Sequence, residues 1–149
     1  MDNYTKSNKI IEVSLNKFRS AEYLKMVNHN AQDAKERYKT TYDLLHYLCE
    51  KFGISTPRLI ITDRIARHTI KNGVLQSKVL GSYQPFGKTI TLYNLTPMRK
   101  QIVSSKSLTG TLLHEFMHHY DYEILKLSKS LHTKGFYMRI SDLENKLKK

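Results

Sequence analysis

The segment "TLLHEFMHHYDY", residues 111–122, contains three histidines and one glutamate within six consecutive positions. On an α-helix, His114 and His118 would lie one turn apart and about 40° apart around the axis, so that both imidazoles can reach one metal ion. Glu115 would lie about 100° around the axis from His114, beside the metal without having to bind it. This H-E-x-x-H arrangement predicts a zinc site, because neutral imidazole suits Zn²⁺ and the carboxylate can act as a general base.

Two histidines do not complete a catalytic zinc site, which usually has three protein ligands and one open position. The chain has a single cysteine, Cys49, so the third ligand must be a histidine or a carboxylate. We predict His132, because the thirteen residues between His118 and His132 leave room for the helix to end and the chain to return. Gly135 would ease that return, since glycine tolerates the backbone conformations of tight turns.

Other acidic residues near the motif compete for a place in the site. Asp121 lies seven residues after His114 and therefore on nearly the same helical face. It would either orient a histidine or bind the metal itself, and we favour the orienting role. Glu123 and Glu144 are further candidate ligands if His132 is an ordinary loop residue.

These residue types also predict a reaction. Zinc would lower the pKa of its bound water towards about 7, and Glu115 would accept the proton and pass it to a leaving amine. A second donor to the oxyanion is commonly needed, and Tyr137, His119 or Arg139 could provide it. Sequence spacing does not choose among the three. His119 lies about 140° from His114 around the helix, and we expect it to be a wall or surface residue.

The segments "LLHEFMHHYDY" and "HTKGFYMRISDL" together resemble the SprT-like branch of the zinc-dependent metallopeptidases. That family has H-E-x-x-H on one helix and a later histidine that leads into G-x-x-F or a near variant. Here Gly135 comes three residues after His132, and Phe136 follows it immediately. Upstream, "LCEKFGISTPRLIIT" and "LGSYQPFGKTITLYN" are similar to the lead-in helix, first strand and hairpin of the family. The resemblance covers about residues 40–145.

The resemblance implies a compact, zincin-like α+β fold with N-terminal helices, a small antiparallel sheet, the H-E-x-x-H helix and a C-terminal helix. We predict one SprT-like domain over residues 1–149, with an N-terminal helical extension, 1–32, and a core, 33–145. The family is associated with intracellular proteolysis, including that of proteins attached to DNA. In such folds an edge strand aligns an extended peptide, and "KTITLYN" or "KVLGSY" would be that strand.

Helices must position the predicted site, and their apolar residues recur at three or four positions. This spacing predicts the H-E-x-x-H helix over about residues 107–127 and another helix over 33–52, which ends at Gly53 and buries Cys49. Tyr38 falls on the same predicted core stripe. An earlier helix, capped by Ser14, is predicted from these residues: Leu15, Phe18, Leu24 and Val27. The lysine-rich end, 145–149, is expected to fray.

The middle of the chain predicts strands. "PRLIIT", 57–62, is a short apolar run, and "KTITLYN", 88–94, alternates apolar and polar residues. "VLQSKVLGSY", 74–83, is interpreted as one further strand. Asn72-Gly73 and "QPFG", 84–87, have the residues of turns, which favours a small antiparallel sheet.

The net charge of +12 is unevenly distributed along the chain. Residues 1–53 carry nine Lys or Arg and seven Asp or Glu, whereas residues 54–149 carry sixteen and six. This excess favours an anionic partner, first of all a nucleic acid, in addition to a protein or peptide substrate. With no apolar run of about 18 residues and no secretory signal, we expect a cytoplasmic protein that does not cross the membrane.

Two functions are consistent with these patterns. The first is a zinc-dependent metalloendopeptidase that acts on protein substrates, including those bound to nucleic acid. The alternative is a non-catalytic or regulatory metal-stabilised basic module that binds DNA or a specific protein partner. Glu115 favours the enzyme, because a structural zinc site would use a fourth protein ligand and has no need of a base. The oligomeric state does not follow from the sequence.

Overall fold

The computed structural model describes the 149-residue chain except for residues 15–19, 66–67, 72–73, 79 and 149. The described residues form an α+β fold, which confirms the predicted fold class. The helices are α1 Asn3–Lys9, α2 Ala21–Val27, α3 Ala34–Phe52, α4 Ser105–Glu123 and α5 Lys134–Lys148. The strands are β1 Arg58–Thr62, β2 His68–Lys71, β3 Val74–Lys78, β4 Gly81–Gln84 and β5 Thr89–Tyr93.

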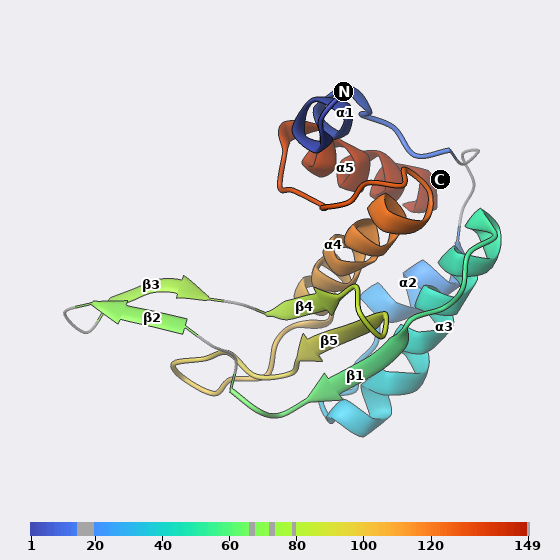
Figure 1. Ribbon diagram of the computed structural model, residues 1–149. Coiled ribbons are helices and arrows are strands. Elements are labelled where there is room, and N and C mark those ends of the chain that lie inside the picture. Colours follow the sequence, from blue (N-terminus) through green and yellow to red (C-terminus); the bar gives the residue numbers. More distant parts are fainter. Residues whose placement is uncertain (15–19, 66–67, 72–73, 79, 149) are drawn as a thin grey trace.

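The main sheet has three strands in the order β1-β5-β4. β5 runs parallel to β1 and antiparallel to β4, so the prediction of an antiparallel sheet was wrong in this respect. The prediction assumed that strands adjacent in sequence pair with each other. Instead the chain forms the separate hairpin β2-β3 after β1, and β5 then lies between β1 and β4. Figure 1 shows this hairpin projecting away from the main body.

The segment 74–83, predicted as one strand, is divided between the two sheets. β3 pairs with β2, and β4 pairs with β5. The predicted connection at 84–87 does join β4 to β5, and Gly87 has a φ of 79°, which glycine adopts without strain. The predicted turn at Asn72-Gly73 lies outside the described residues.

The long helix α3 agrees with the prediction. Asp33 caps its first turn by accepting a hydrogen bond from the Lys35 backbone N–H, and Gly53 ends it with a φ of 68°. Cys49 is fully buried in the core, as expected, and burial raises the pKa of its thiol to about 12. Tyr38, however, is exposed, and its ring stacks on that of Tyr42 with the ring centroids 6.0 Å apart.

The two ends of the chain differ from the predictions. α2 begins after Ser20, which caps it, and not after Ser14. Leu15 and Phe18 lie outside the described residues. α5 continues to Lys148 and buries Leu147, so the predicted fraying does not extend that far. The carbonyl of Leu147 accepts a hydrogen bond from Ser20, which ties the end of α5 to the start of α2.

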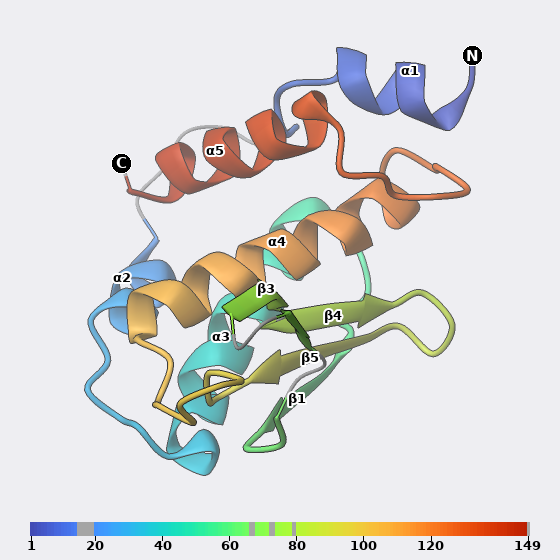
Figure 2. The ribbon, with the colours of Figure 1, turned by 90° about the vertical axis from the view of Figure 1, so that its left-hand side faces the viewer.

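α4 lies between the main sheet and α5 (Figure 2). It packs against β4 and β5 on one side and α5 on the other, and α2 and α3 also contact it. Leu112, Phe116 and Met117 are fully buried by these neighbours. The H-E-x-x-H residues therefore lie on a helix that is held on several sides. Within the described residues, none of the helices has the length and apolar character to span a bilayer.

Candidate metal centre

Three imidazoles converge beside an open cavity. Two of them belong to α4, and the third belongs to the loop that leads into α5. The Nε2 atom of His132 lies 3.2 Å from that of His114 and 3.0 Å from that of His118. All three candidate ligand atoms lie within 4.8 Å of one another. The structure thus brings together the three histidines that the sequence singled out. They can hold one metal ion.

Burial favours the neutral form of His114 and His118, which is the form that a metal requires. The pKa of His118 is lowered to about 3, first by burial and then by the neighbouring His114 and His132. Burial also lowers the pKa of His114, and His132 adds to this effect. Phe136 from α5 packs beneath the group, with its ring centroid 4.6 Å from that of His118. This aromatic contact was not predicted from the sequence, which indicated only that Phe136 lies on a helix.

A chain of hydrogen bonds determines which nitrogen of His118 carries its proton. The Ser130 hydroxyl donates to Asp121 Oδ2 at 2.7 Å. The Oγ atom of Ser130 also lies 2.7 Å from His118 Nδ1. Because the hydroxyl proton is already given to the carboxylate, the serine oxygen must accept from His118 Nδ1–H. The Nε2 lone pair of His118 is therefore free to point at the metal position. Asp121 reaches the site through Ser130 and does not contact the three ligand nitrogens in any described hydrogen bond.

Asp121 is itself held by a buried arginine. Arg139 Nη2 lies 2.9 Å from Asp121 Oδ1 and 3.0 Å from Oδ2, and both side chains are fully buried. Burial raises the pKa of the Asp121 carboxyl, while the hydrogen bonds from Ser130 and Arg139 oppose that rise. The guanidinium fixes the carboxylate in the orientation that receives the Ser130 proton. Arg139 was a candidate oxyanion donor from the sequence, but its guanidinium is fully buried and is bonded to Asp121.

Glu115 is in the opposite situation. Its side chain is only 6% exposed, yet it makes no hydrogen bond or ion pair with any of the described residues. Burial raises the pKa of its carboxyl to about 7. Such a group is costly to keep in a fold, because a largely buried carboxylate loses part of its hydration and here receives no hydrogen bond from a described residue in return. Its position is therefore better explained by function than by stability.

The carboxylate and the three imidazoles line one open cavity of about 590 Å³. The rest of the wall comes from Leu80 and Gly81 beside β4 and from the first turns of α4: Ser107, Gly110 and Thr111. Gly81 is required here, since an added Cβ would lie 2.6 Å from Cγ2 of Thr111. The glycine thus allows the edge strand β4 to approach the helix that carries the histidines.

The neighbouring histidine, His119, lies on the packed side of α4. Its Nε2 donates to the carbonyl of Ser55 at 2.8 Å, and its Nδ1 accepts from the Tyr83 hydroxyl at 2.8 Å. It is fully buried, so the expectation of a wall or surface position was wrong. The surrounding core, formed by α3, β4 and α4, covers it. Both nitrogens are occupied away from the cavity.

The remaining predicted residues are separate from the three histidines. Glu123 forms an ion pair with Lys88 at the end of α4. Glu144 accepts a hydrogen bond from Tyr23 at 3.0 Å. Tyr137 is half exposed, and its ring centroid lies 6.0 Å from those of His114 and His132. Of the three predicted oxyanion donors, Tyr137 is thus the one beside the metal position.

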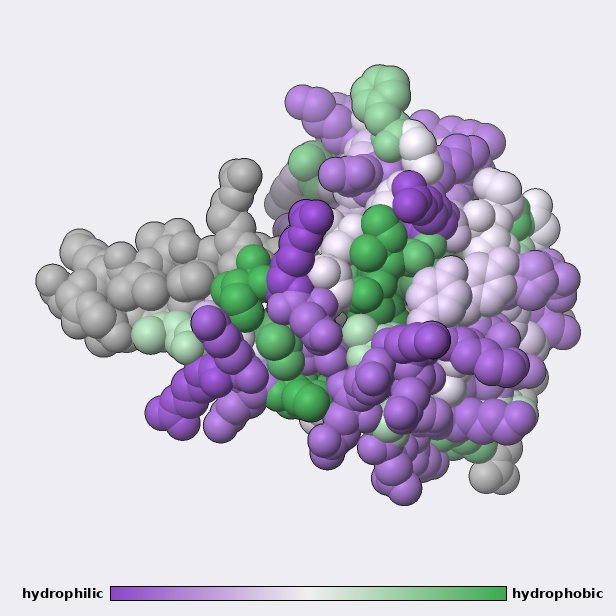
Figure 3. Space-filling model, turned by 90° about the horizontal axis from the view of Figure 1, so that it is seen from below, coloured by the Kyte–Doolittle hydropathy of each residue, from purple (hydrophilic) through white to green (hydrophobic). Residues whose placement is uncertain are grey.

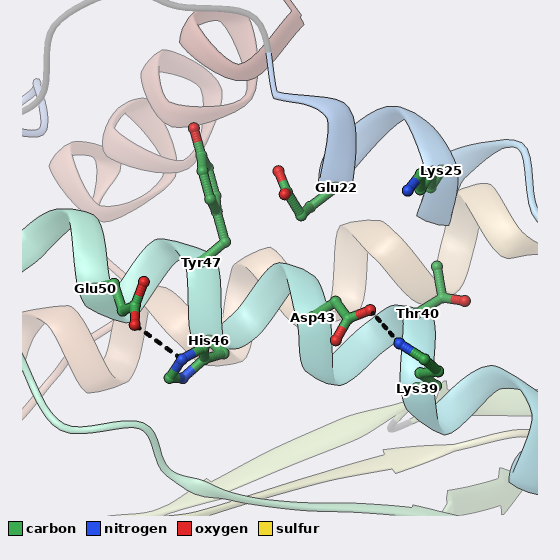
Figure 4. Close-up of a pocket in the computed structure, with 8 residues that line it drawn as sticks. All are labelled: Glu22, Lys25, Lys39, Thr40, Asp43, His46, Tyr47 and Glu50. Atoms are coloured by element: carbon green, nitrogen blue, oxygen red, sulfur yellow. Dashed lines mark hydrogen bonds and ion pairs between the residues drawn. The ribbon is translucent and has the colours of Figure 1, made fainter.

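A second hollow, between α2 and α3, has a different character (Figure 4). It measures about 420 Å³, and its α3 wall carries ion pairs between Lys39 and Asp43 and between His46 and Glu50. Because these side chains are largely exposed and satisfy each other, we assign no site to it.

Comparison with known structures concerns the fold. The chain is similar to Wss1 from Saccharomyces cerevisiae, known from a crystal structure, with a TM-score of 0.51 and 19% sequence identity. The similarity covers 76% of this chain and 78% of the Wss1 chain. No protein-family model matches the sequence, and no curated protein matches it. The agreement at this level of identity supports a zincin-like α+β architecture.

Proposed function

We propose that this protein is a zinc-dependent metalloendopeptidase that hydrolyses peptide bonds in protein substrates. His114, His118 and His132 would hold the zinc ion, and Glu115 would be the catalytic base. One observation carries the proposal: a largely buried carboxylate that has no hydrogen bond or ion pair with a described residue shares an open cavity with three convergent imidazoles. A purely structural metal site would have no use for this carboxylate.

The donor set fits zinc. With Zn–N bonds of about 2.0–2.1 Å, two nitrogens at neighbouring corners of a tetrahedron lie roughly 3.3–3.4 Å apart. The distances from His132 Nε2 to the other two Nε2 atoms, 3.0 and 3.2 Å, are close to that separation. When bound, zinc would polarise a carbonyl oxygen and make water acidic enough to attack at neutral pH.

The protein's own groups supply the proton transfers and the orientation. Glu115 lines the cavity and has no competing partner, so it can accept the proton of the attacking water and return it to the leaving amine. The Asp121–Ser130 pair keeps the proton of His118 on Nδ1, away from the ligand nitrogen. Tyr137 is our candidate for hydrogen bonding to the oxyanion, because it lies beside His114 and His132.

An extended substrate would pair with β4. This strand lies at an edge of the main sheet, and Gly81 at its start lines the cavity beside His114. β5, the other strand considered from the sequence, occupies the centre of the sheet and has neighbours on both sides. Backbone pairing with β4 would align a peptide along the cleft without demanding a particular sequence.

The fold supports this assignment more broadly. The chain shares the fold of Wss1 over 76% of its length, and its two motif segments resemble the SprT-like family. We accordingly interpret residues 1–149 as one SprT-like domain and place the protein in the cytoplasm. Both assignments remain proposals.

We also propose a nucleic acid as a second partner, so that proteins bound to it become substrates. Residues 64–114 contain eight Lys or Arg and no Asp or Glu. Arg99, Lys100 and Lys106 from this stretch are exposed and form no ion pair with another described residue. The face seen in Figure 3 has many hydrophilic side chains around a band of hydrophobic ones. Such a surface would neutralise the phosphates of a nucleic acid near the first turns of α4, which line the cavity.

Cleavage of an unfolded protein tests the enzymatic proposal directly. Zinc-loaded wild type should degrade it, and Glu115→Gln should reduce the rate about 10²- to 10⁴-fold, which is the usual loss when a general base is removed. Glu36→Gln, the same change on the exposed surface of α3, is the control and should leave the rate unchanged. Equal cleavage by Glu115→Gln and wild type would refute the role of Glu115. Metal binding without any cleavage would instead favour the binding module.

The nucleic-acid proposal is tested separately by salt-dependent binding to single- and double-stranded DNA. Substituting Arg99, Lys100 and Lys106 together with Ala should weaken binding and flatten its dependence on salt concentration. Replacing three lysines of α3, Lys35, Lys39 and Lys51, removes the same charge elsewhere. Equal losses for both sets would mean that net charge, and not this surface, determines binding.

A further inference from the structure

The N-terminal segment lies directly on the loop that connects α4 to α5. We call residues 3–13, which include α1, the N-terminal strap. Figures 1 and 2 both show α1 beside α5, at the end of the molecule where the loop turns. The loop, residues 124–133, carries Ser130 and His132. The strap was predicted to belong to an extension outside the core, yet it contacts the segment that supplies two groups of the metal centre.

The strap is bonded to the loop on both sides of Ser130 and His132. Asn3 donates to Ser128 Oγ at 2.6 Å and accepts from the Ser128 backbone N–H at 3.1 Å. Lys6 donates to the carbonyl of Leu125 at 2.5 Å. On the other side, the hydroxyls of Ser7 and Thr133 lie 2.9 Å apart and are buried. The residues that position and supply the histidine ligands are thus enclosed between two anchored points.

The strap also supplies hydrogen-bond acceptors to Arg139. The guanidinium donates to the carbonyls of Ser7 and Ile10, each at 2.6 Å, and to Ser7 Oγ at 3.1 Å. Without these acceptors, Asp121 would be the one hydrogen-bonding partner of the buried cation among the described residues, beside the ring of Phe136, whose centroid lies 6.0 Å from Cζ. The carbonyl oxygens come from the last turn of α1 and the residue after it, where the helix dipole is negative. These carbonyls thus accept hydrogen bonds from the guanidinium that holds Asp121. Asp121 in turn accepts from Ser130, which contacts His118.

The fit between the strap and α5 is close enough to require a glycine. A Cβ added to Gly135 would lie 2.2 Å from the carbonyl oxygen of Ser7 and 2.8 Å from the backbone of Asn8. The backbone N–H of Gly135 in turn donates to the Asn8 side chain at 3.1 Å. The sequence suggested Gly135 as an aid to chain reversal, but the contact with the strap is the constraint that the structure displays.

We propose that the N-terminal strap is a positioning element of the metal centre. It fixes the loop at Leu125, Ser128 and Thr133, so that His132 stays within reach of the ion. It also accepts hydrogen bonds from Arg139, which keeps Asp121 in place and, through Ser130, orients His118. The inference rests on the proposed metal site. It adds that residues 3–13, outside the motif-bearing region, determine how tightly and with what geometry the metal is held.

The test compares two double variants of α1 in the full chain. Asn3→Ala/Lys6→Ala removes the anchors to Ser128 and Leu125. Tyr4→Ala/Lys9→Ala is the matched control, with the same loss of charge on the same helix but at exposed positions that make no described hydrogen bond or ion pair. Zinc release to a chelator and the visible spectrum of the cobalt-substituted proteins are measured at a temperature where all metal-free proteins remain folded.

The strap variant should release zinc about 10-fold faster than wild type, in the range expected when groups that orient metal ligands are removed. Its cobalt spectrum should also change, whereas the control should match wild type in both. Lys6→Arg, which keeps a donor for the Leu125 carbonyl, should release zinc more slowly than Lys6→Ala. Gly135→Ala should accelerate release by displacing the strap as a whole.

Wild-type rates and spectra in the Asn3→Ala/Lys6→Ala protein would overturn the proposal. Equal effects in the strap variant and its control would do the same, because they would indicate a general effect on α1. If wild type itself bound no metal, the proposed function would fail first. That result is distinguishable from a wild type that binds zinc and a strap variant that binds it equally well.

Discussion

Two sets of polar residues at the site are in opposite circumstances. In the first set, whose partners lie in packed parts of the fold, His119 uses both ring nitrogens and Asp121 is held by Ser130 and Arg139. In the second set, which lines the cavity, Glu115 is buried without a hydrogen bond or ion pair to a described residue, and three imidazoles face one another. Buried polar groups normally find partners within the fold. The contrast indicates that the first set builds the scaffold, and that the second set is left available for a ligand.

The largest expected effect is a loss of stability in the first set, which builds the scaffold. Asp121→Asn removes the charge that neutralises a fully buried guanidinium, so the free energy of unfolding should fall by about 3–5 kcal/mol. Chemical denaturation of the metal-free protein measures this loss. A change below about 1 kcal/mol would mean that Arg139 finds other acceptors and that the Asp121–Arg139 pair is not central to the scaffold.

A smaller effect is expected at Ser130, which connects the two sets through Asp121 and His118. Ser130→Ala breaks the connection between Asp121 and His118, so His118 no longer has a fixed tautomer. Zinc affinity should fall about 10- to 100-fold, as measured by competition with a chelator. Ser141→Ala, on the exposed surface of α5, is the control. Unchanged zinc affinity in Ser130→Ala would show that the imidazole is oriented by packing against Phe136 alone.

The smallest effect has the opposite sign to the first. Glu115→Gln replaces a buried, unpartnered carboxylate by a neutral group of the same shape, so the metal-free protein should become more stable by about 0.5–2 kcal/mol. Asp121→Asn is the same chemical change six residues further along the helix. Thermal and chemical unfolding of the two variants side by side should therefore give changes of opposite sign. Destabilisation by Glu115→Gln would indicate an unrecognised structural role for the carboxylate.

What the sequence could predict was local. The spacing of His114, Glu115 and His118 on an amphipathic helix depends only on the period of the α-helix, and the structure has that helix. The end of α3 was equally local, because Gly53 can adopt the left-handed conformation that ends a helix. His132 required a guess about how the chain returns, supported by a family resemblance. The structure brings its Nε2 atom next to the other two, although its role as a ligand stays a proposal.

What the sequence could not predict depends on contacts between distant segments. Ser130 acts through the conformation of a loop, and no spacing rule connects it to Asp121. Arginine is ordinarily a surface residue, so the burial of Arg139 becomes intelligible only with Asp121 and the carbonyls of α1 in place. The position of β5 between β1 and β4 likewise depends on pairing across the inserted hairpin.

The most direct test of the central claim is the zinc content of the purified protein, determined by elemental analysis for wild type and His132→Ala. The account predicts one zinc per wild-type chain and substantially less in the variant, because only the two imidazoles of His114 and His118 remain to hold the ion. A wild type without zinc after incubation with the metal, or a His132→Ala protein that retains one zinc per chain, would contradict it.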